Sequence, residues 1–339
     1  MAVHCATMKA ELAEPAGVVT PSALAEESFL RDIPISFRTR VIVWLMKLIM
    51  RPMLSRMINA NYHKIAKIQL RVASMRCPDT AGLKLDYRIL GKVPGHTLGT
   101  LDDPRKPVVL WLHGGAFILP AAPGAHLVMI ARLSRDLGAD AFVPDYRLAP
   151  FNRFPAALDD CENAYRVLLD RGFSPSRIVL GGDSAGGNLA LGVLQRIRKA
   201  GLPMPACALP VSPVTEMGRV HGPPSRFRKA KGDPILPIAA LQRVDELYAG
   251  DWDAADPELS PLYADCTGFP PMYFLASDNE VLMDDTVLLA HRAREAGVQV
   301  RCDVWPLLPH AFPLFEMLFP EVAAARKDMA EFARRYLAR

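Results

Sequence analysis

From about residue 75 onward, short apolar runs alternate with longer stretches of helical periodicity. Two of the runs, VVLWL at 108–112 and MYFLA at 272–276, are apolar at nearly every position. Such runs are typical of strands buried on both faces of a parallel sheet. The alternation predicts an α/β fold, with a mostly parallel central sheet flanked by helices. The predicted strands are Leu83–Leu90, Val108–Leu112, Ala141–Val143, Arg177–Leu180, Ala206–Val211, Met272–Ala276 and Val298–Trp305, and the predicted helices are Gly124–Leu137, Pro155–Leu169, Asn188–Lys199 and Asp284–Glu295.

Residues 1–70 depart from this alternation because they are helix-like and hold no strand pattern. Within them, FRTRVIVWLMKLIMRPMLSRMINANY mixes apolar side chains with Arg and Lys. The mixture fits a helix that covers an apolar cleft, or a basic amphipathic helix on a membrane surface. We favour the covering helix because the apolar residues nearly fill the helix circumference.

Residues 213–260 also depart from the alternation. They contain six prolines and the basic run RFRKAK at 226–231, and they lie between two predicted strands. We therefore interpret them as an insertion above the strand ends. A basic run of this kind is typical of a solvated surface.

Composition and charge exclude several classes of protein. With 339 residues, 50% of them hydrophobic, the chain can bury a large core without disulfides or metals. The net charge of +4, from 40 basic and 36 acidic residues, is too balanced to indicate a nucleic-acid partner. The six cysteines lie far apart and form no metal or redox motif. We expect no metal and no organic cofactor.

The sequence also predicts a location. Its most apolar run, VIVWLMKLIM at 41–50, is interrupted by Lys47 and is much shorter than the ~20 residues that span a bilayer. The opening residues lack the apolar core of a secretory signal. We therefore expect a cytoplasmic protein with reduced thiols and no membrane anchor.

The strongest local motif is GDSAG at 182–186, which follows the strand RIVL and opens the helix GNLALGVLQRIRK. G-x-S-x-G in this strand–turn–helix context is typical of a nucleophile elbow, where a sharp turn holds the serine hydroxyl above the sheet. Ser184 is the predicted nucleophile.

A serine nucleophile needs a base, which comes after it in the chain order of this motif. Three histidines follow Ser184. His221 lies in the insertion, and His291 lies in a predicted helix, flanked by arginines. His310 lies in the loop PLLPHAFP after the last predicted strand, from which its side chain can return to Ser184. His310 is the predicted base.

An acid should orient the base, and it should lie in the loop after the strand PMYFLA. Asp278 and Glu280 both qualify by position, and spacing alone does not choose between them. Asp284 and Asp285 are expected to cap and charge the start of the next helix.

Backbone N–H groups must stabilise the oxyanion that forms during acyl transfer. Ala185, directly after the nucleophile, supplies one. We expect the others, from Gly114 and Gly115, in the HGGAF loop at 113–117 after the strand VVLWL. His113 precedes the nucleophile and is expected to brace this loop.

Together these pieces resemble the bacterial hormone-sensitive-lipase-like esterases, the family IV carboxylesterases of the α/β-hydrolase superfamily. The resemblance covers about residues 75–339 and implies an α/β-hydrolase fold with an N-terminal helical cap. Residues 1–70 would form the cap segment and 71–339 the catalytic domain, with 213–260 contributing to the cap. The matching segments are HGGAF at 113–117, DYRLAP at 145–150, FPAALDD at 154–160, GDSAGGNLA at 182–190, DPELSPL at 256–262 and PHAF at 309–312.

The resemblance also bears on individual residues. The family's acid loop commonly reads D-P-L-x-D-E with the first Asp catalytic, and in this chain Glu280 takes that position, with Asp278 as the alternative. Ala116 stands where many relatives carry a third glycine. Asp160 and Asp183 are expected to be structural, and Tyr146 and Arg147 to brace the loop behind the oxyanion turn.

We therefore expect a serine carboxylesterase that hydrolyses short- to medium-chain esters through an acyl-enzyme, with a small-molecule ester as its substrate. An amidase or lactonase with the same triad, and a non-catalytic small-molecule binding protein, remain the alternatives. The family also implies a homodimer through the edge of the last strand. The predicted site consists of the triad Ser184, Glu280 and His310 and the oxyanion donors Gly114, Gly115 and Ala185.

Overall fold

The computed structural model describes residues 29–217 and 222–338. Within these residues, eight strands form one sheet in the order β1-β2-β4-β3-β5-β6-β7-β8. β1 and β2 pair antiparallel, as do β2 and β4, and all other neighbours pair parallel. The strands are β1 (Leu85–Leu90), β2 (Val93–Leu98), β3 (Val108–Leu112), β4 (Asp140–Pro144), β5 (Ile178–Asp183), β6 (Cys207–Val211), β7 (Met272–Ser277) and β8 (Val300–Trp305).

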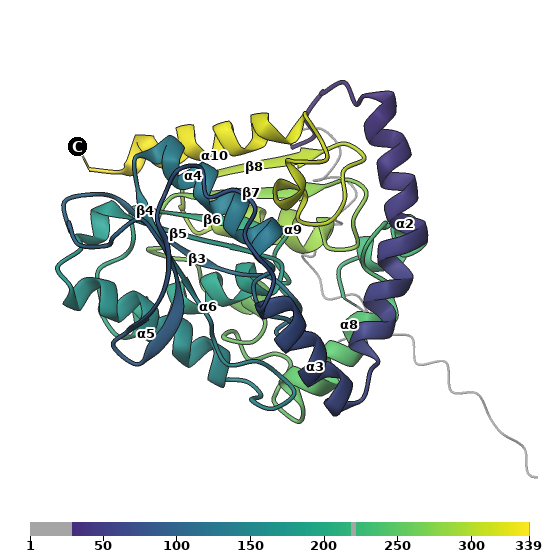
Figure 1. Ribbon diagram of the computed structural model, residues 1–339, viewed down its shortest axis with the longest axis horizontal. Coiled ribbons are helices and arrows are strands. Elements are labelled where there is room, and N and C mark those ends of the chain that lie inside the picture. Colours follow the sequence, from purple (N-terminus) through teal and green to yellow (C-terminus); the bar gives the residue numbers. More distant parts are fainter. Residues whose placement is uncertain (1–28, 218–221, 339) are drawn as a thin grey trace, which may run out of the picture.

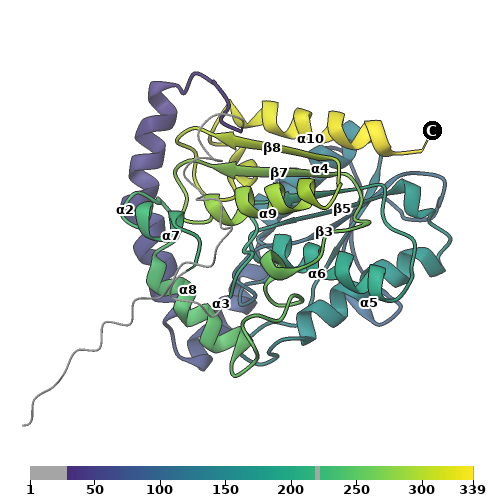
Figure 2. The ribbon, with the colours of Figure 1, turned by 180° about the vertical axis from the view of Figure 1, so that it is seen from behind.

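Helices cover both faces of the sheet (Figures 1 and 2). α4 (Val128–Leu137) and α10 (Val322–Tyr336) pack together on one face. α5 (Ala156–Asp170), α6 (Ala185–Lys199) and α9 (Met283–Glu295) lie on the other. Every residue of β3 to β7 is buried, as expected for strands covered on both sides. The short helical turns are η1 (Pro123–Leu127), η2 (Pro175–Arg177), η4 (Pro261–Tyr263) and η5 (Phe312–Phe315).

The segments expected to form the cap are α2 (Phe37–Ile58), α3 (Tyr62–Ala73) and the described part of the insertion. Side chains fix the start of both helices, because the Ser36 hydroxyl accepts from the Thr39 N–H and the Asn61 amide oxygen from the Lys64 N–H. α3 ends at Ala73, slightly beyond the expected boundary at 70. The insertion contributes α7 (Ser225–Arg228), α8 (Ile238–Val244) and η3 (Asp245–Ala249), and α8 packs on α2.

The sequence pattern missed β2, which reads VPGHTL. Pro94 and Gly95 are depleted in strands, so the usual alternation is absent. The sheet explains the glycine: a Cβ at Gly95 would lie 2.5 Å from the Val143 carbonyl oxygen of β4. The close approach of the β4 backbone therefore explains why β2 carries a glycine at position 95.

The basic run at 226–231 is not simply a solvated surface. Arg226 is buried, and its guanidinium bonds the Asp285 carboxylate at 2.5 and 3.0 Å. Arg228 pairs with Asp284 at 2.9 Å. Both aspartates lie in the first turn of α9, as expected, but neither side chain caps it. They instead bind the insertion to the catalytic domain, because a buried carboxylate needs a charged or hydrogen-bonding partner.

The outer edge of β8 already pairs within the chain. The Val304 N–H donates to the Phe29 carbonyl at 2.7 Å, and the Arg31 N–H donates to the Val304 carbonyl at 2.9 Å. Arg31 also pairs with Asp303 at 3.4 Å. A homodimer through this edge, which remains an expectation, would have to form beside this pairing or displace it.

Candidate active site

Ser184 occupies a strained turn between β5 and α6. Its backbone has φ 54° and ψ −117°, a conformation that costs a non-glycine residue about 1–3 kcal/mol. The turn is possible only because its flanks are glycines. A Cβ on Gly182 would collide with the Gly186 carbonyl, and one on Gly186 with the Leu112 carbonyl of β3. The serine is therefore held at the carboxyl end of the sheet by backbone packing.

Glu280 and His310 lie together although they come from different loops. The His310 Nδ1 lies 2.5 Å from the Glu280 Oε2, and both side chains are buried. The other carboxylate oxygen accepts from the Ser277 N–H and from the Ser212 hydroxyl, each at 2.8 Å. The carboxylate is thus fully hydrogen-bonded and holds the imidazole in one orientation.

Asp278 is placed differently. Its Oδ1 accepts from the Leu307 N–H at 2.7 Å, and its own N–H donates to the Trp305 carbonyl at 2.9 Å. It therefore joins the acid loop to the loop after β8. Of the two candidate acids, the structure brings Glu280 to the imidazole.

The surroundings of His310 favour its charged form. Burial lowers the pKa of the imidazole, but the hydrogen bond and negative charge of Glu280 outweigh burial, and Asp233 adds to them, so the pKa lies above its ordinary value. Asp233 is buried in the insertion and accepts from the Val281 N–H at 2.9 Å, directly beside Glu280. A cap residue thereby supports the acid loop.

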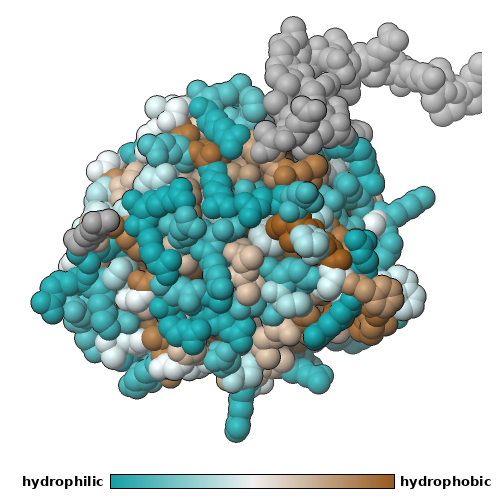
Figure 3. Space-filling model, turned by 90° about the horizontal axis from the view of Figure 1, so that it is seen from above, coloured by the Kyte–Doolittle hydropathy of each residue, from teal (hydrophilic) through white to brown (hydrophobic). Residues whose placement is uncertain are grey.

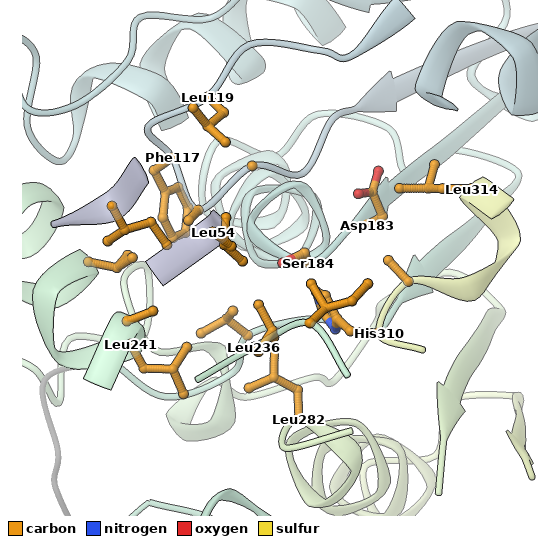
Figure 4. A pocket seen from close by; sticks show the side chains of 18 of the residues that line it. Leu54, Phe117, Leu119, Asp183, Ser184, Leu236, Leu241, Leu282, His310 and Leu314 are labelled. Carbon is orange, nitrogen blue, oxygen red and sulfur yellow. The ribbon is translucent and has the colours of Figure 1, made fainter. Parts of the chain in front are cut away.

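Ser184 and His310 face the same cavity (Figure 4). Among the described residues, no hydrogen bond joins the Ser184 hydroxyl to the imidazole. Such bonds are often long in unliganded sites and tighten when substrate binds. The three predicted triad residues thus meet at one edge of the sheet, with the Glu280–His310 contact already formed.

The HGGAF loop differs in detail from the expectation. The Gly114 N–H donates to the Asp183 Oδ2 at 3.1 Å, so it is not free to bind an oxyanion. Gly115 (φ 120°) and Ala116 (φ 58°) instead line the cavity, and in the described part of the chain their N–H groups donate to no protein acceptor. The available donors on this loop are therefore Gly115 and Ala116, not Gly114.

Buried side chains hold this loop from behind. The Tyr146 hydroxyl donates to the His113 carbonyl at 2.7 Å, and the two rings stack with centroids 4.2 Å apart. Burial lowers the pKa of His113 to about 4, so the imidazole is neutral near pH 7, and its Nδ1 lies 2.7 Å from the Gly114 carbonyl oxygen. Arg147 does not brace the loop; it binds Asp160 of α5.

Asp183 has the structural role expected of it, and it revealed a partner that the sequence reasoning missed. Its carboxylate accepts from the Trp111 indole N–H at 2.9 Å and lies 3.2 Å from the His126 Nε2. The His126 Nδ1 accepts from the Ala122 N–H, so Nε2 carries the proton. Burial raises the pKa of Asp183, but His126 and these hydrogen bonds outweigh it, and the net pKa is lowered. Nothing in the local sequence around His126 marks this role.

Ser212, which bonds Glu280 and accepts from the Ala311 N–H at 3.2 Å, was missed as well. It directly follows β6. A polar residue at the carboxyl end of a parallel strand was therefore the signal that could have found it.

The cavity above Ser184 is mostly apolar (Figure 4). The segments expected to form the cap supply much of its wall. Phe117 of the HGGAF loop and Leu119, two residues after it, supply another part. Phe117 in turn stacks on Tyr248 of η3, with ring centroids 3.8 Å apart. Within the described residues, no group of His, Cys, Asp and Glu side chains has the arrangement of a metal site. The cavity residues from α2 and the insertion are Met50, Leu54, Ile58, Val214, Glu216, Met217, Arg226, Ile235, Leu236, Ala240, Leu241, Val244 and Asp245.

Comparison with known proteins agrees with this architecture. Residues 109–314 match a family model described as an alpha/beta hydrolase fold. The chain is 37% identical to an acetyl-hydrolase of Streptomyces hygroscopicus over 67% of its length and 75% of the relative's. It is 34% identical to the esterase LipU of Mycobacterium tuberculosis, over 68% of this chain and 79% of LipU.

Among solved structures, an esterase from the bacterial hormone-sensitive lipase family superposes with a TM-score of 0.79 at 30% identity. The superposition covers 90% of this chain and 100% of that one. The family match, the eight-stranded sheet and the elbow at Ser184 agree with one another. The chain belongs to the hormone-sensitive-lipase-like (family IV) esterases of the α/β-hydrolase superfamily.

Proposed function

We propose that this protein is a serine carboxylesterase in which Ser184 is the nucleophile, His310 the general base and Glu280 the residue that orients the base. The observation that carries the proposal is the buried Glu280–His310 pair, which faces the same apolar cavity as the strained serine. A serine becomes nucleophilic only when a positioned base takes its proton.

The reaction follows from these positions. His310 takes the hydroxyl proton as Ser184 attacks the acyl carbon, and the N–H groups of Gly115, Ala116 and Ala185 stabilise the oxyanion. The imidazolium then gives its proton to the leaving alcohol, which leaves an acyl-enzyme. A water, deprotonated by His310, attacks the acyl carbon. The acyl carbon–Oγ bond then breaks as the imidazolium returns its proton to Ser184, which releases the acid.

The size of the cavity supports esters of small acyl groups as substrates. Its volume is ≈ 170 Å³, and an apolar cavity of about 150 Å³ is large enough for a benzene-sized ligand. Apolar walls favour the hydrocarbon part of an ester, while the oxyanion donors act on its carbonyl. This supports short- to medium-chain esters, which the cap encloses above the catalytic domain.

We also propose that the cap is a separate substrate-binding unit made of residues 1–70 and 213–260, with 71–339 as the catalytic domain. The contact between α2 and α8 supports this division, as does the part that both helices take in the cavity wall. Residues 1–28 and 218–221, including His221, lie outside the described residues.

The test is Ser184→Ala, measured with p-nitrophenyl butyrate. We expect kcat to fall by about 10⁴-fold or more, because the nucleophile is gone while the oxyanion donors remain. A p-nitrophenyl phosphonate should transfer its phosphonyl group to Ser184 with release of p-nitrophenol, so the mass of the wild-type chain rises and that of the variant does not. Ser174→Ala is the matched control, since Ser174 is exposed and, within the described residues, its hydroxyl bonds only the Ser176 hydroxyl. Full activity in Ser184→Ala would disprove the proposal.

A further inference from the structure

The helix α2 is apolar on two opposite faces. Its inner face packs on the cap and the cavity, where Met50, Leu54 and Ile58 line the wall. Its outer face exposes large side chains: Trp44 is 60% exposed and Ile49 62%. Soluble proteins rarely leave so many large apolar groups together on one face. The term outer face refers below to the exposed side of α2 that carries Phe37, Val41, Trp44, Leu45, Leu48 and Ile49.

These residues form one stripe along the helix. Positions 37, 41, 44, 45 and 48 follow the spacing i, i+4, i+7, i+8 and i+11, which places them on one side of an α-helix. Figure 3 shows hydrophobic side chains gathered toward the side where Figure 1 shows α2, whereas the rest of that view is largely hydrophilic. The exposed groups therefore lie on one side of the helix.

The charge around the stripe is strongly one-sided. Residues 33–78 contain nine Lys or Arg and no Asp or Glu, whereas the rest of the chain contains 31 basic and 36 acidic residues. Arg38, Arg40 and Arg56 of α2 are exposed, and in the described ranges no carboxylate pairs with them. Arg51 is different, because it bonds backbone carbonyls of the insertion, among them that of Ala230 at 2.6 Å.

We propose that the outer face of α2 is a docking surface for a membrane that contains anionic lipids, with the helix lying in the plane of the interface. Exposed Trp, Phe and Leu side chains flanked by cations are the features that such interfacial helices use. The apolar stripe would enter the boundary between headgroups and acyl chains, and the cations would contact the headgroups.

The charge also argues against a second copy of this chain as the occupant. In a symmetric dimer the same patch lies on both sides of the interface, so two helices that carry only positive charge would face each other. An anionic bilayer instead neutralises those charges. No helix in the described ranges is long and apolar enough to cross a membrane, and lying on the surface requires no crossing.

The docked orientation would place the catalytic cavity directly behind the membrane-bound helix. The outer face would contact lipid while Met50, Leu54 and Ile58, on the inner side of the same helix, contact the substrate. Docking itself uses none of the catalytic residues, so it can be tested independently of the esterase activity.

Trp44 supplies a direct readout. The chain has four tryptophans, of which Trp111 and Trp305 are fully buried. When the full-length chain is mixed with phosphatidylglycerol vesicles, we expect a blue shift of the tryptophan emission and co-sedimentation with the lipid. Trp44→Phe should abolish the shift and leave sedimentation largely intact. A shift that persists in this variant would overturn the assignment, since Trp252 is also partly exposed.

A triple variant tests the whole face: Trp44→Ser, Leu48→Ser and Ile49→Ser together. We expect vesicle affinity to fall by tenfold or more, with unchanged hydrolysis of p-nitrophenyl acetate as proof that the fold and the site are intact. The matched control is Ile89→Ser, which removes an equally exposed apolar side chain from β1. It should leave vesicle binding unchanged.

A charge variant distinguishes binding to anionic lipid from nonspecific hydrophobic adsorption. Arg38→Gln with Arg40→Gln should weaken binding to phosphatidylglycerol by about fivefold for each charge, and high salt should do the same. Binding to pure phosphatidylcholine should be weak for every variant. Equal binding to both lipids would overturn the proposal. So would a wild-type dimer that binds no vesicles and that the triple variant converts to a monomer, because the face would then join two copies.

Discussion

The elbow at Ser184 and the cap helix α2 lie on either side of one cavity but are held in place by different forces. At the elbow, backbone segments pack directly against each other, and a methyl group on Gly186 would collide with the Leu112 carbonyl. At α2, apolar side chains pack on the insertion, while the opposite face of the helix remains exposed. The first region tolerates almost no change in geometry, and the second has room for many side chains.

This difference matches what each region must do. Acyl transfer depends on positions within a fraction of an ångström, so rigid backbone contacts and a buried, fully bonded carboxylate suit it. An apolar wall only has to exclude water and fit a hydrocarbon, and its contacts can be exchanged at modest cost. Substitutions should therefore affect the rate of reaction at the elbow and selectivity at the cap.

The largest effect is expected at the elbow. Gly186→Ala should reduce the free energy of unfolding by about 3 kcal/mol or more, because the new Cβ overlaps backbone that cannot move away. Urea denaturation measures it. Gly124→Ala is the matched control, since its Cβ would come no closer than 3.9 Å to another residue, and we expect a change within about 1 kcal/mol. Equal stability of the two variants would contradict the comparison.

Next comes the buried acid. Glu280→Gln should lower kcat by about 10³- to 10⁴-fold, because the amide cannot stabilise the imidazolium. Asp278→Asn should cost less than about tenfold, since Asp278 bonds a backbone N–H and not the imidazole. Kinetics with p-nitrophenyl butyrate compares the two, and a larger loss in Asp278→Asn would reverse the assignment of the acid.

The pH profile gives a second test of the same pair. His310 must be neutral to act as the base, and its pKa is raised, so activity should fall as the pH drops through a value above about 6.5. Removing the charge of Glu280 destabilises the imidazolium, which lowers this pKa. The acidic limb of kcat/KM in Glu280→Gln should therefore move to lower pH. An unmoved limb would mean that another group controls the profile.

Asp233 should show an intermediate effect, because it belongs to the cap but acts on the triad. Asp233→Asn removes a negative charge that raises the pKa of His310 and an acceptor for the Val281 N–H. We expect kcat/KM to fall by about tenfold and the acidic limb to move to lower pH by less than in Glu280→Gln. A loss of activity without any movement of the limb would assign Asp233 a purely structural role.

The smallest effect is expected in the cavity wall. Leu54→Ala should raise KM for p-nitrophenyl butyrate by about three- to tenfold and shift preference toward longer acyl chains, because it removes contacts and adds space. Leu48→Ala, on the outer face of the same helix, is the matched control and should leave the chain-length profile unchanged. The same shift in both variants would show that α2 acts through its stability and not through its inner face.

The sequence by itself determined the parallel strands, the flanking helices and the turn at Ser184, and it predicted His310 as the base. These features are local: an apolar run buried on both faces predicts a strand, and G-x-S-x-G after such a strand predicts the turn. His310 followed from chain order and from the loop that holds it. The sequence pattern did not predict β2, because its proline and glycine are untypical of strands. The glycine is explained only by the close β4 backbone in the folded sheet.

Tertiary structure alone decided how the local pieces are connected. It chose Glu280 over Asp278 as the partner of His310, placed Ser212 behind the carboxylate and turned the Gly114 N–H toward Asp183. It buried Arg226 against Asp285, although the basic run suggested a solvated surface. It also packed one apolar side of α2 against the cavity and left the opposite side exposed. Hydrogen-bond partners and exposure depend on segments far apart in the chain, and spacing along one segment carries no information about either.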